Sequence, residues 1–174
     1  MNPIIQDIYV RLAVMSFKHY LKNRRMMKRP ENLPDELTQT RAGCFVTLHK
    51  GGRLRGCIGT ISPVQACLAD EIIANAVSAA VGDPRFSPVR EEEIPDIDCS
   101  VDVLSEPEDI ASRDELDVRK YGVIVSRGSR RGLLLPDLEG VDTVEEQVSI
   151  ALGKAGIRED EPVRLQRFLV VRHE

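Results

Sequence analysis

The chain has 174 residues and a formal net charge of −4 at pH 7, with 42% hydrophobic and 30% charged residues. This length fits one domain with a sizeable core, and the composition is that of a globular protein rather than a disordered or fibrous one. The negative charge argues against a general binder of nucleic-acid phosphates, because such proteins carry a basic surface. A local basic patch is still compatible with this balance.

The hydropathy of the sequence predicts no membrane segment, because no apolar run approaches the roughly 20 residues that span a bilayer. Residues 1–7 lack the basic and apolar regions of a secretory signal. We therefore expect a cytoplasmic protein in which Cys44, Cys57, Cys67 and Cys99 are free thiols. None of them forms a C-x-x-C pair, so no metal site is expected, and no cofactor motif is evident.

Helical periodicity runs from Ile4 to Leu21, where apolar residues recur at intervals of three and four. The polar, proline-bearing stretch 22–40 follows. We interpret it as an ordered surface excursion or a mobile loop rather than a domain linker, because too little chain precedes it to fold alone. The whole chain, 1–174, is therefore expected to form a single domain with at most a minor lobe.

A β-hairpin is predicted over residues 44–58, around a glycine-rich turn. A two-residue loop would place Lys50 opposite Arg53, and two like charges directly opposite each other are destabilising. A three-residue loop instead pairs Leu48 with Leu54 and makes one face of the hairpin wholly apolar. The three-residue loop is therefore the preferred register.

Further elements follow along the chain. They are a helix from Ser62 to Gly82, a strand over 97–104, a short helix capped by Ser112, a hairpin of 121–126 and 132–135, a helix from Thr143 to Gly156 and a strand over 165–171. The first of these helices opens with the capping box Ser62-Pro63-Val64-Gln65. Strands and helices do not alternate strictly, so we expect an α+β fold with an antiparallel or mixed β-sheet flanked by helices.

The segment from Arg53 to Thr60 is the candidate working centre. In the preferred register Arg53, Arg55 and Cys57 share one face of the strand. A thiol beside two guanidinium groups is expected to have a lowered pKa, because positive charge stabilises the thiolate. Cys57 would then be a nucleophile and Arg55 its electrostatic support.

Three further features favour a ligand at this centre. Gly56 and Gly59 flank Cys57 and remove side-chain bulk, which would let a ligand approach the backbone. The amino terminus of the next helix, near Ser62, would supply N–H groups that favour an anion. Asp83 and Arg85 lie on either side of a proline and either orient a substrate or pair with each other. The alternative is that Asp83 and Pro84 simply form a turn after Gly82, with Arg85 on the surface.

An alternative interpretation of Cys57 is structural, because free cysteine is among the most buried residue types. His49 is a poor candidate for its general base. In the preferred register His49 lies four residues from the level of Cys57, about 13 Å at ~3.3 Å per residue. A direct dyad needs roughly 3 Å, so a Cys-His hydrolase is disfavoured.

The hexapeptide Leu54-Arg55-Gly56-Cys57-Ile58-Gly59 resembles the signature of the AMMECR domain family, named for the AMME syndrome chromosomal-region gene product. Bacterial and archaeal members are called AmmeMemoRadiSam system protein A. The similarity extends through Asp83-Pro84-Arg85-Phe86 and through the run from Arg130 to Pro136. It implies an antiparallel sheet with flanking helices, a small second lobe and a cleft faced by the hexapeptide. It also implies a Memo-like protein and a radical S-adenosylmethionine protein as partners, and no particular reaction.

Three functions are open at this point. The first is a thiol-dependent enzyme or carrier for an anionic substrate, with Cys57 and Arg55 as catalytic residues. Its candidate substrate contacts are Arg53, Gly56, Gly59, Asp83, Arg85, Arg130 and Arg131. The second is a non-catalytic binding or partner module of the three-protein system. The third is nucleic-acid binding through a turn with Arg127, Arg130 and Arg131, which the acidic balance of the chain disfavours.

Overall fold

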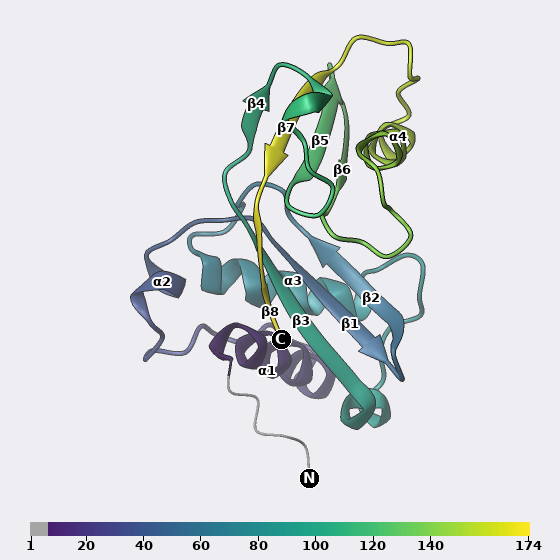
Figure 1. The fold of residues 1–174 in the computed structure, drawn as a ribbon. Coiled ribbons are helices and arrows are strands. Elements are labelled where there is room, and N and C mark those ends of the chain that lie inside the picture. Colours follow the sequence, from purple (N-terminus) through teal and green to yellow (C-terminus); the bar gives the residue numbers. More distant parts are fainter. Residues whose placement is uncertain (1–6) are drawn as a thin grey trace. The chain divides into compact units, whose positions relative to one another are not determined.

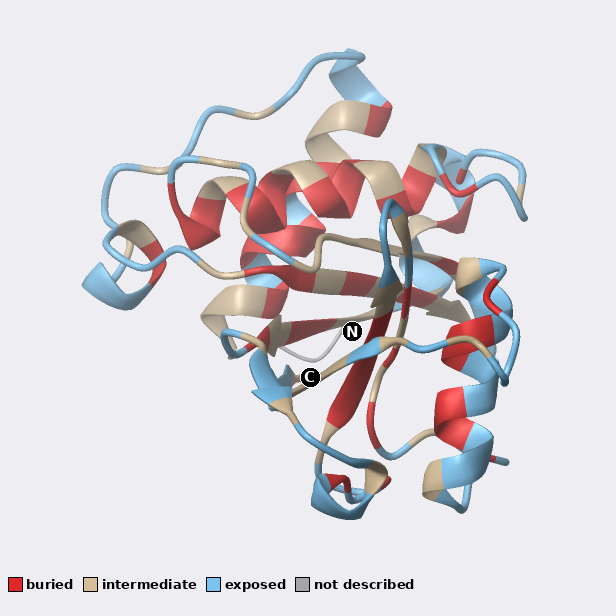
Figure 2. Cartoon of the chain, turned by 90° about the horizontal axis from the view of Figure 1, so that it is seen from above, coloured by how far each residue is buried: buried red, intermediate tan, exposed pale blue. Residues whose placement is uncertain are grey.

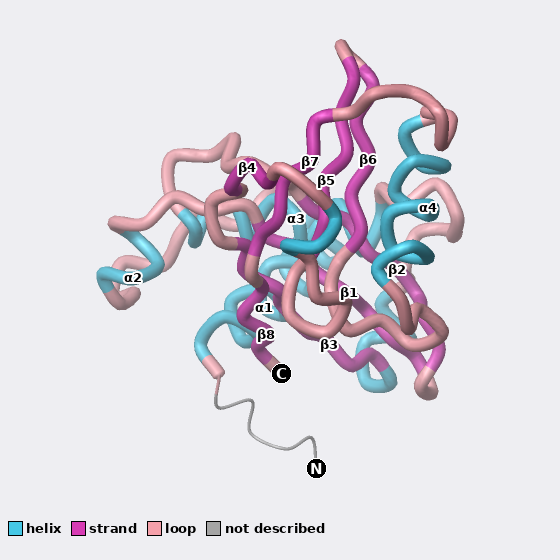
Figure 3. Tube along the Cα trace, turned by 45° about the horizontal axis from the view of Figure 1, so that its top comes forward, coloured by secondary structure: helices cyan, strands magenta, loops and turns pink. Residues whose placement is uncertain are grey.

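The computed structural model describes residues 7–174, which form two compact units (Figure 1). Unit 1 comprises the described residues up to 104 together with 171–174, and unit 2 comprises residues 105–170. Each unit combines helices with strands of a four-stranded sheet (Figure 3). The α+β prediction is confirmed, and the strand pairings with a defined register are antiparallel. No helix within residues 7–174 is long and apolar enough to cross a membrane.

Unit 1 contains the sheet with strand order β2-β1-β3-β8. Its strands are β1 (Cys44–Lys50), β2 (Arg53–Gly59), β3 (Ile97–Leu104) and β8 (Val170–His173), and its helices are α1 (Ile8–Asn23), α2 (Asp35–Thr38), α3 (Leu68–Val81) and the 3-10 helix η1 (Glu91–Asp96). The sequence predicts β3 with the bounds that the structure shows. β1 lies between β2 and β3, so β2 is an edge strand.

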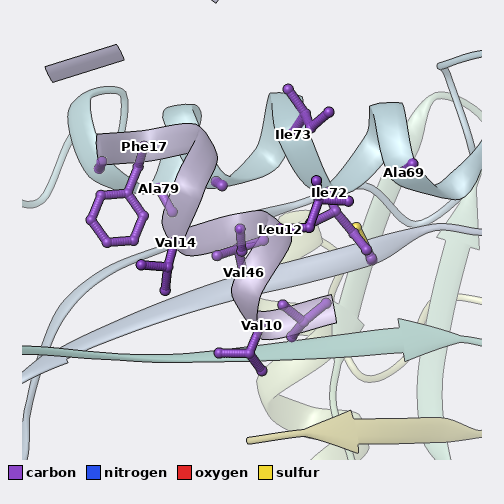
Figure 4. Packing of buried hydrophobic residues seen from close by; sticks show 14 of the residues in the cluster. Val10, Leu12, Val14, Phe17, Val46, Ala69, Ile72, Ile73 and Ala79 are labelled. Carbon is purple, nitrogen blue, oxygen red and sulfur yellow. The ribbon is translucent and has the colours of Figure 1, made fainter. Parts of the chain in front are cut away.

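The core of unit 1 lies between the sheet and the helices α1 and α3 (Figure 4). Val46 and Leu48 of β1 are fully buried, and Thr47 between them is not, as expected for a strand with one face on a core. Leu12 and Phe17 from α1 and Ile72 from α3 complete the same cluster. The packing of both helices therefore identifies the face of β1 that carries Val46 and Leu48 as the inner face.

Asp7 caps the start of α1, and its carboxylate accepts the N–H groups of Tyr9 and Val10. The part of the predicted helix that begins at Ile4 lies outside the described residues. The carboxyl-terminal strand packs against this helix start. The His173 ring stacks on Tyr9 with centroids 3.7 Å apart, and its Nδ1 atom lies 2.8 Å from Asp7 Oδ2. The segment 22–40 that follows α1 contains α2, and Leu37 of α2 is fully buried in the unit 1 core.

The turn of the β1–β2 hairpin differs from the predicted one. Lys50 lies opposite Arg53, so the loop has two residues, and both glycines have positive φ, 56° and 74°. A two-residue turn of this kind matches the right-handed twist of the strands it joins. The like-charge pair is tolerated because Lys50 Nζ donates to a carboxylate of Glu93, 3.1 Å away. The predicted three-residue loop is therefore wrong.

The register of the hairpin also shifts by one residue between Leu48 and His49. As a result Leu48 faces Gly56, and Leu54 faces His49 with 38% of its surface exposed. The predicted pairing of Leu48 with Leu54, and the core position of Leu54, are both wrong. A bulge of this kind inserts one extra residue into a strand and bends it.

Helix α3 begins at Leu68 rather than at the predicted Ser62. The buried carboxylate of Glu71 accepts the N–H groups of Val64 and Gln65 at 2.9 and 2.8 Å, and it keeps this segment as a loop. Val64, which lies within the predicted helix, is 68% exposed. The helix ends at Gly82, as predicted.

Unit 2 contains the sheet with strand order β4-β7-β5-β6. Its elements are β4 (Glu108–Ile110), η2 (Arg113–Glu115), β5 (Gly122–Arg127), β6 (Arg130–Leu134), α4 (Val144–Ala155) and β7 (Arg164–Phe168). The helix predicted from Thr143 to Gly156 is confirmed as α4, with a capping box at Thr143 and the left-handed residue Gly156 at its two ends. Buried residues alternate with exposed residues along α4 (Figure 2). The predicted closing strand 165–171 is instead divided between β7 and β8, which belong to different sheets.

Candidate functional site

Cys57 lies on the outer face of the unit 1 sheet. It is the direct partner of Thr47, and Thr47 alternates with the inward-facing Val46 and Leu48. On its other side Thr47 faces Ser100 of β3. Cys57, Thr47 and Ser100 therefore form a row of one thiol and two hydroxyl groups across three strands.

The Cys57 side chain is half-buried, and its sulfur lies 3.2 Å from Thr47 Oγ1. Burial raises the pKa of the Cys57 thiol, while the hydrogen bond with Thr47 and the positive charge of Arg85 act in the opposite direction. The net direction is upward, so the predicted lowering of this pKa is wrong. The physical reason is that loss of hydration disfavours the thiolate more than its neighbours favour it.

Arg55 is bound to a carboxylate rather than to Cys57. Its Nε and Nη2 atoms donate to Glu93 at 3.1 and 3.0 Å, and its Nη1 atom donates to the carbonyl of Ser87 at 2.9 Å. Arg55, together with the other donors around Glu93, lowers the pKa of this carboxyl to about 2. Nothing in the local sequence indicates this bond, because Glu93 ends an acidic run that has the pattern of a solvated surface.

Asp83 and Arg85 form a bidentate ion pair beside Cys57. Asp83, which is buried, accepts from Arg85 Nε at 3.0 Å and from Nη2 at 2.8 Å. It also accepts the backbone N–H of Cys57 at 2.9 Å, and Arg85 Nη2 reaches the Cys57 carbonyl at 3.4 Å. Arg85 holds the pKa of the Asp83 carboxyl far below its usual range. The predicted pairing of Asp83 with Arg85 is observed, and the orientation of a substrate by these two residues stays a prediction.

The glycines beside Cys57 have packing roles. A Cβ atom on Gly56 would collide with the backbone carbonyl of Ala79 in α3, and one on Gly59 would collide with the Phe45 ring. These contacts account for both glycines without a ligand. The predicted anion site near Ser62 is also wrong, because the Glu71 carboxylate already occupies the N–H groups of the following residues.

Arg53 is exposed at the hairpin turn, opposite Lys50. His49 lies closer to the level of Cys57 than predicted, because Thr47 rather than Phe45 is the partner of Cys57. Two residues along a strand still correspond to about 7 Å, so His49 is beyond hydrogen-bond reach. Among residues 7–174 no three His, Cys, Asp or Glu side chains are grouped so that they could hold a metal ion.

The arginines of the β5–β6 turn belong to unit 2. Arg130 donates to Glu161 at 2.7 Å and to the carbonyl of Gly156 at 2.8 Å. Arg127 lies 3.3 Å from the same Glu161 carboxylate. One carboxylate thus offsets part of the charge of two arginines, while Arg131 is exposed.

Comparison with known proteins gives consistent matches. A sequence-family model described as AMMECR1 matches residues 10–173. A Thermotoga maritima protein is 53% identical over 168 residues, which are 95% of this chain and 97% of that protein. A Clostridium acetobutylicum protein is 51% identical over 170 residues, and the match covers 97% of this chain but 36% of that longer protein. The crystal structure of an uncharacterized protein from Pyrococcus horikoshii has a TM-score of 0.87 and 34% identity, and covers 94% of this chain and 88% of that one.

Proposed function

Because this chain belongs to the AMMECR1 family, we propose that it binds a small anionic ligand at its family hexapeptide, with Arg85 as the charged contact. The observation that carries the proposal is that Arg85 is both exposed and held in place. Its side chain is 56% exposed, yet a buried carboxylate holds it in one position beside Cys57.

The geometry of Arg85 leaves part of its guanidinium for a ligand. Its Nε and Nη2 atoms are engaged by Asp83 and by the Cys57 carbonyl, and none of its hydrogen bonds to described residues uses Nη1. A guanidinium already fixed in place loses little conformational entropy when it binds an anion. Arg85 therefore supports recognition of a carboxylate or phosphate oxygen through Nη1.

The neutral thiol of Cys57 is the second contact in this proposal. Its raised pKa keeps it protonated at neutral pH, so it offers a weak S–H donor rather than a negative charge that would repel an anion. Thr47, which is hydrogen-bonded to the Cys57 sulfur, fixes the position of the thiol.

Calorimetric titration tests anion binding directly. We expect succinate or inorganic phosphate to bind the wild-type protein, and we expect Arg85→Gln to weaken binding at least ~10-fold through loss of a charge-assisted hydrogen bond. Arg53→Gln is the matched control, because Arg53 is an exposed arginine of β2, the strand that carries Cys57. Equal affinities for wild type and Arg85→Gln would refute the proposal.

A second candidate is a thiol-dependent enzyme or carrier. The observation that favours it is that the Cys57 side chain is half-buried rather than sealed, and lies near the positive charge of Arg85. The test is a search by intact mass for a covalent adduct after incubation with a metabolite extract. An adduct on wild type that is absent from Cys57→Ser supports this function, and an unmodified wild-type chain contradicts it.

The family resemblance adds a cellular setting to the proposal. We propose that the protein acts as the binding component of a system with a Memo-like protein and a radical S-adenosylmethionine protein. Co-purification of the three from cells, with wild type and with Cys57→Ser, tests this setting. Partner binding that survives the change indicates a docking surface independent of the thiol, and no co-purification with wild type contradicts the setting.

A further inference from the structure

Two half-buried phenylalanines border the proposed anion site. The chain has four phenylalanines, and two of them, Phe17 and Phe168, are only 1% exposed. The other two, Phe45 and Phe86, keep part of their surface exposed. Both lie beside residues of the proposed anion site, which makes them candidates for contact with the ligand.

Phe45 of β1 points to the same face of the sheet as Cys57. It alternates with the buried Cys44 and Val46, and it is the direct partner of Gly59 in β2. The Phe45 ring lies so close to Gly59 that a Cβ atom there would collide with it. Glycine thus lets the ring lie against the backbone of β2. The part of the ring that stays exposed forms an apolar platform on the outer face of the sheet.

Phe86 is engaged by Arg85. The Phe86 N–H donates to the Asp83 carbonyl at 3.2 Å, and the Arg85 Cζ atom lies 5.5 Å from the centre of the Phe86 ring. A guanidinium is attracted to an aromatic ring at this distance. Phe86 therefore helps to hold Arg85 in place, and Phe45 is the ring that we assign to ligand contact.

One small molecule can reach both Arg85 and Phe45. Arg85 Nη2 donates to the Cys57 carbonyl at 3.4 Å, and the Phe45 ring lies over Gly59. Cys57 and Gly59 are two residues apart in β2, which corresponds to about 7 Å along a strand. A single aromatic ring with an acidic substituent spans a distance of this order.

We propose that the ligand of the anion site is an aromatic acid, whose carboxylate or phosphate binds Arg85 and whose ring packs on Phe45. This inference rests on the proposed anion binding and adds the chemical class of the ligand. Paired aromatic rings are stabilised by their packing geometry in addition to the burial of apolar area. An aliphatic anion of the same charge would bind Arg85 and leave Phe45 in water.

Titration with matched pairs of anions, followed by NMR chemical shifts, tests the class of the ligand. The pairs are benzoate with acetate and phenyl phosphate with inorganic phosphate. We expect wild type to bind the aromatic member of each pair at least ~10-fold more tightly, because it buries one ring. In Phe45→Leu this ratio should fall to ~3-fold or less. Tyr20→Leu is the matched control, because Tyr20 is a half-buried aromatic residue of α1, on the inner side of the sheet.

A second measurement on wild type needs no substitution. We expect nuclear Overhauser contacts between the benzoate ring protons and the Phe45 ring, whose signals are readily assigned among four phenylalanines. Contacts to other residues but not to Phe45 would place the ring elsewhere and overturn the inference.

The titrations separate failure of this inference from failure of anion binding. If inorganic phosphate binds through Arg85 but benzoate binds no better than acetate, the aromatic class is wrong and the proposed function stands. A preference for benzoate that persists in folded Phe45→Leu also contradicts the inference. If none of the four anions binds wild type, the proposed function fails and this inference fails with it.

Discussion

At the scale of single residues, Cys57 yields a prediction about reactivity. Burial raises the pKa of its thiol, so we expect alkylation by iodoacetamide to have a pH midpoint above the ~8.5 of free cysteine. Arg85→Gln should move the midpoint higher, because the guanidinium charge lowers this pKa. Rates would be followed by peptide mass spectrometry, which separates Cys57 from the other three cysteines. A midpoint at or below ~8.5 would show that the thiolate is stabilised after all.

The surroundings of Cys57 were only partly predictable. Strand alternation explains why Thr47 points away from the core, since it lies between the buried Val46 and Leu48, but its pairing with Cys57 depends on a register that was predicted wrongly. The guanidinium next to Cys57 is that of Arg85, 28 residues away, rather than that of Arg55. Local sequence cannot show that Arg55 binds Glu93, because that bond depends on how a distant 3-10 helix packs against the hairpin.

At the scale of elements, Glu93 joins η1 to the β1–β2 hairpin, and its titration gives a second prediction. Its pKa is about 2 in the folded chain and ~4.3 when unfolded. Because the pKa of Glu93 is lower in the folded chain, its carboxylate stabilises the fold at pH values above the pKa of the unfolded chain. This contribution is lost as pH falls from ~4 towards 2. At neutral pH it is on the order of 3 kcal/mol.

Urea unfolding as a function of pH measures this contribution. We expect Glu93→Gln to be less stable than wild type at pH 7 by an amount of that order, and the difference to vanish near pH 2. Glu92→Gln is the control, because Glu92 is exposed on the same 3-10 helix. A difference between wild type and Glu93→Gln that does not depend on pH would contradict the assignment.

Two glycines of unit 2 give opposite predictions. A Cβ atom on Gly132 of β6 would collide with the carbonyl of Ala151 in α4, whereas one on Gly153 of α4 would meet nothing within 4 Å. Gly132→Ala should therefore destabilise the protein by about 1–3 kcal/mol through overpacking. Gly153→Ala should stabilise it by up to ~1 kcal/mol, because alanine is the better helix former. Thermal unfolding distinguishes the two, and a stabilising Gly132→Ala would contradict the close packing of β6 on α4.

The elements that were predicted well from the sequence are those whose first and last residues are marked by nearby capping residues. Helix α4 is an example, because its cap at Thr143 and its left-handed Gly156 are encoded in adjacent residues. The predicted start of α3 was wrong because Glu71, inside the helix, binds the backbone of the segment that precedes the helix. The predicted length of the hairpin loop was wrong because Glu93, 43 residues from Lys50, binds Lys50. This ion pair offsets the repulsion between Lys50 and Arg53 on which the prediction relied.

At the scale of the whole molecule, charge distribution gives a prediction about nucleic acids. The chain carries a net charge of −4, and Arg127 and Arg130 share the carboxylate of Glu161. We expect no binding of single-stranded RNA or duplex DNA whose affinity falls with salt in fluorescence anisotropy. Glu161→Gln should increase any residual affinity, because it frees both arginines. A wild-type affinity for RNA or DNA that falls steeply with salt concentration would contradict this prediction.

The fold class was predictable from the order of helices and strands, but the division of the last strand was not. Residues 165–171 show continuous strand character, while β7 and β8 belong to different sheets. Periodicity reports which residues are buried, and it carries no information on which sheet buries them. That information depends on the pairing of β7 with β5, whose residues lie far earlier in the chain.

The stacking of His173 on Tyr9 has a practical consequence for protein engineering. Because Asp7 and His173 touch, a short peptide linker could join the two ends of the described chain into a ring. A covalent ring restricts the unfolded chain much more than the folded one, so cyclisation should raise resistance to heat without any new contact. The same proximity makes circular permutation feasible, with new ends opened at an exposed turn such as Gly51-Gly52.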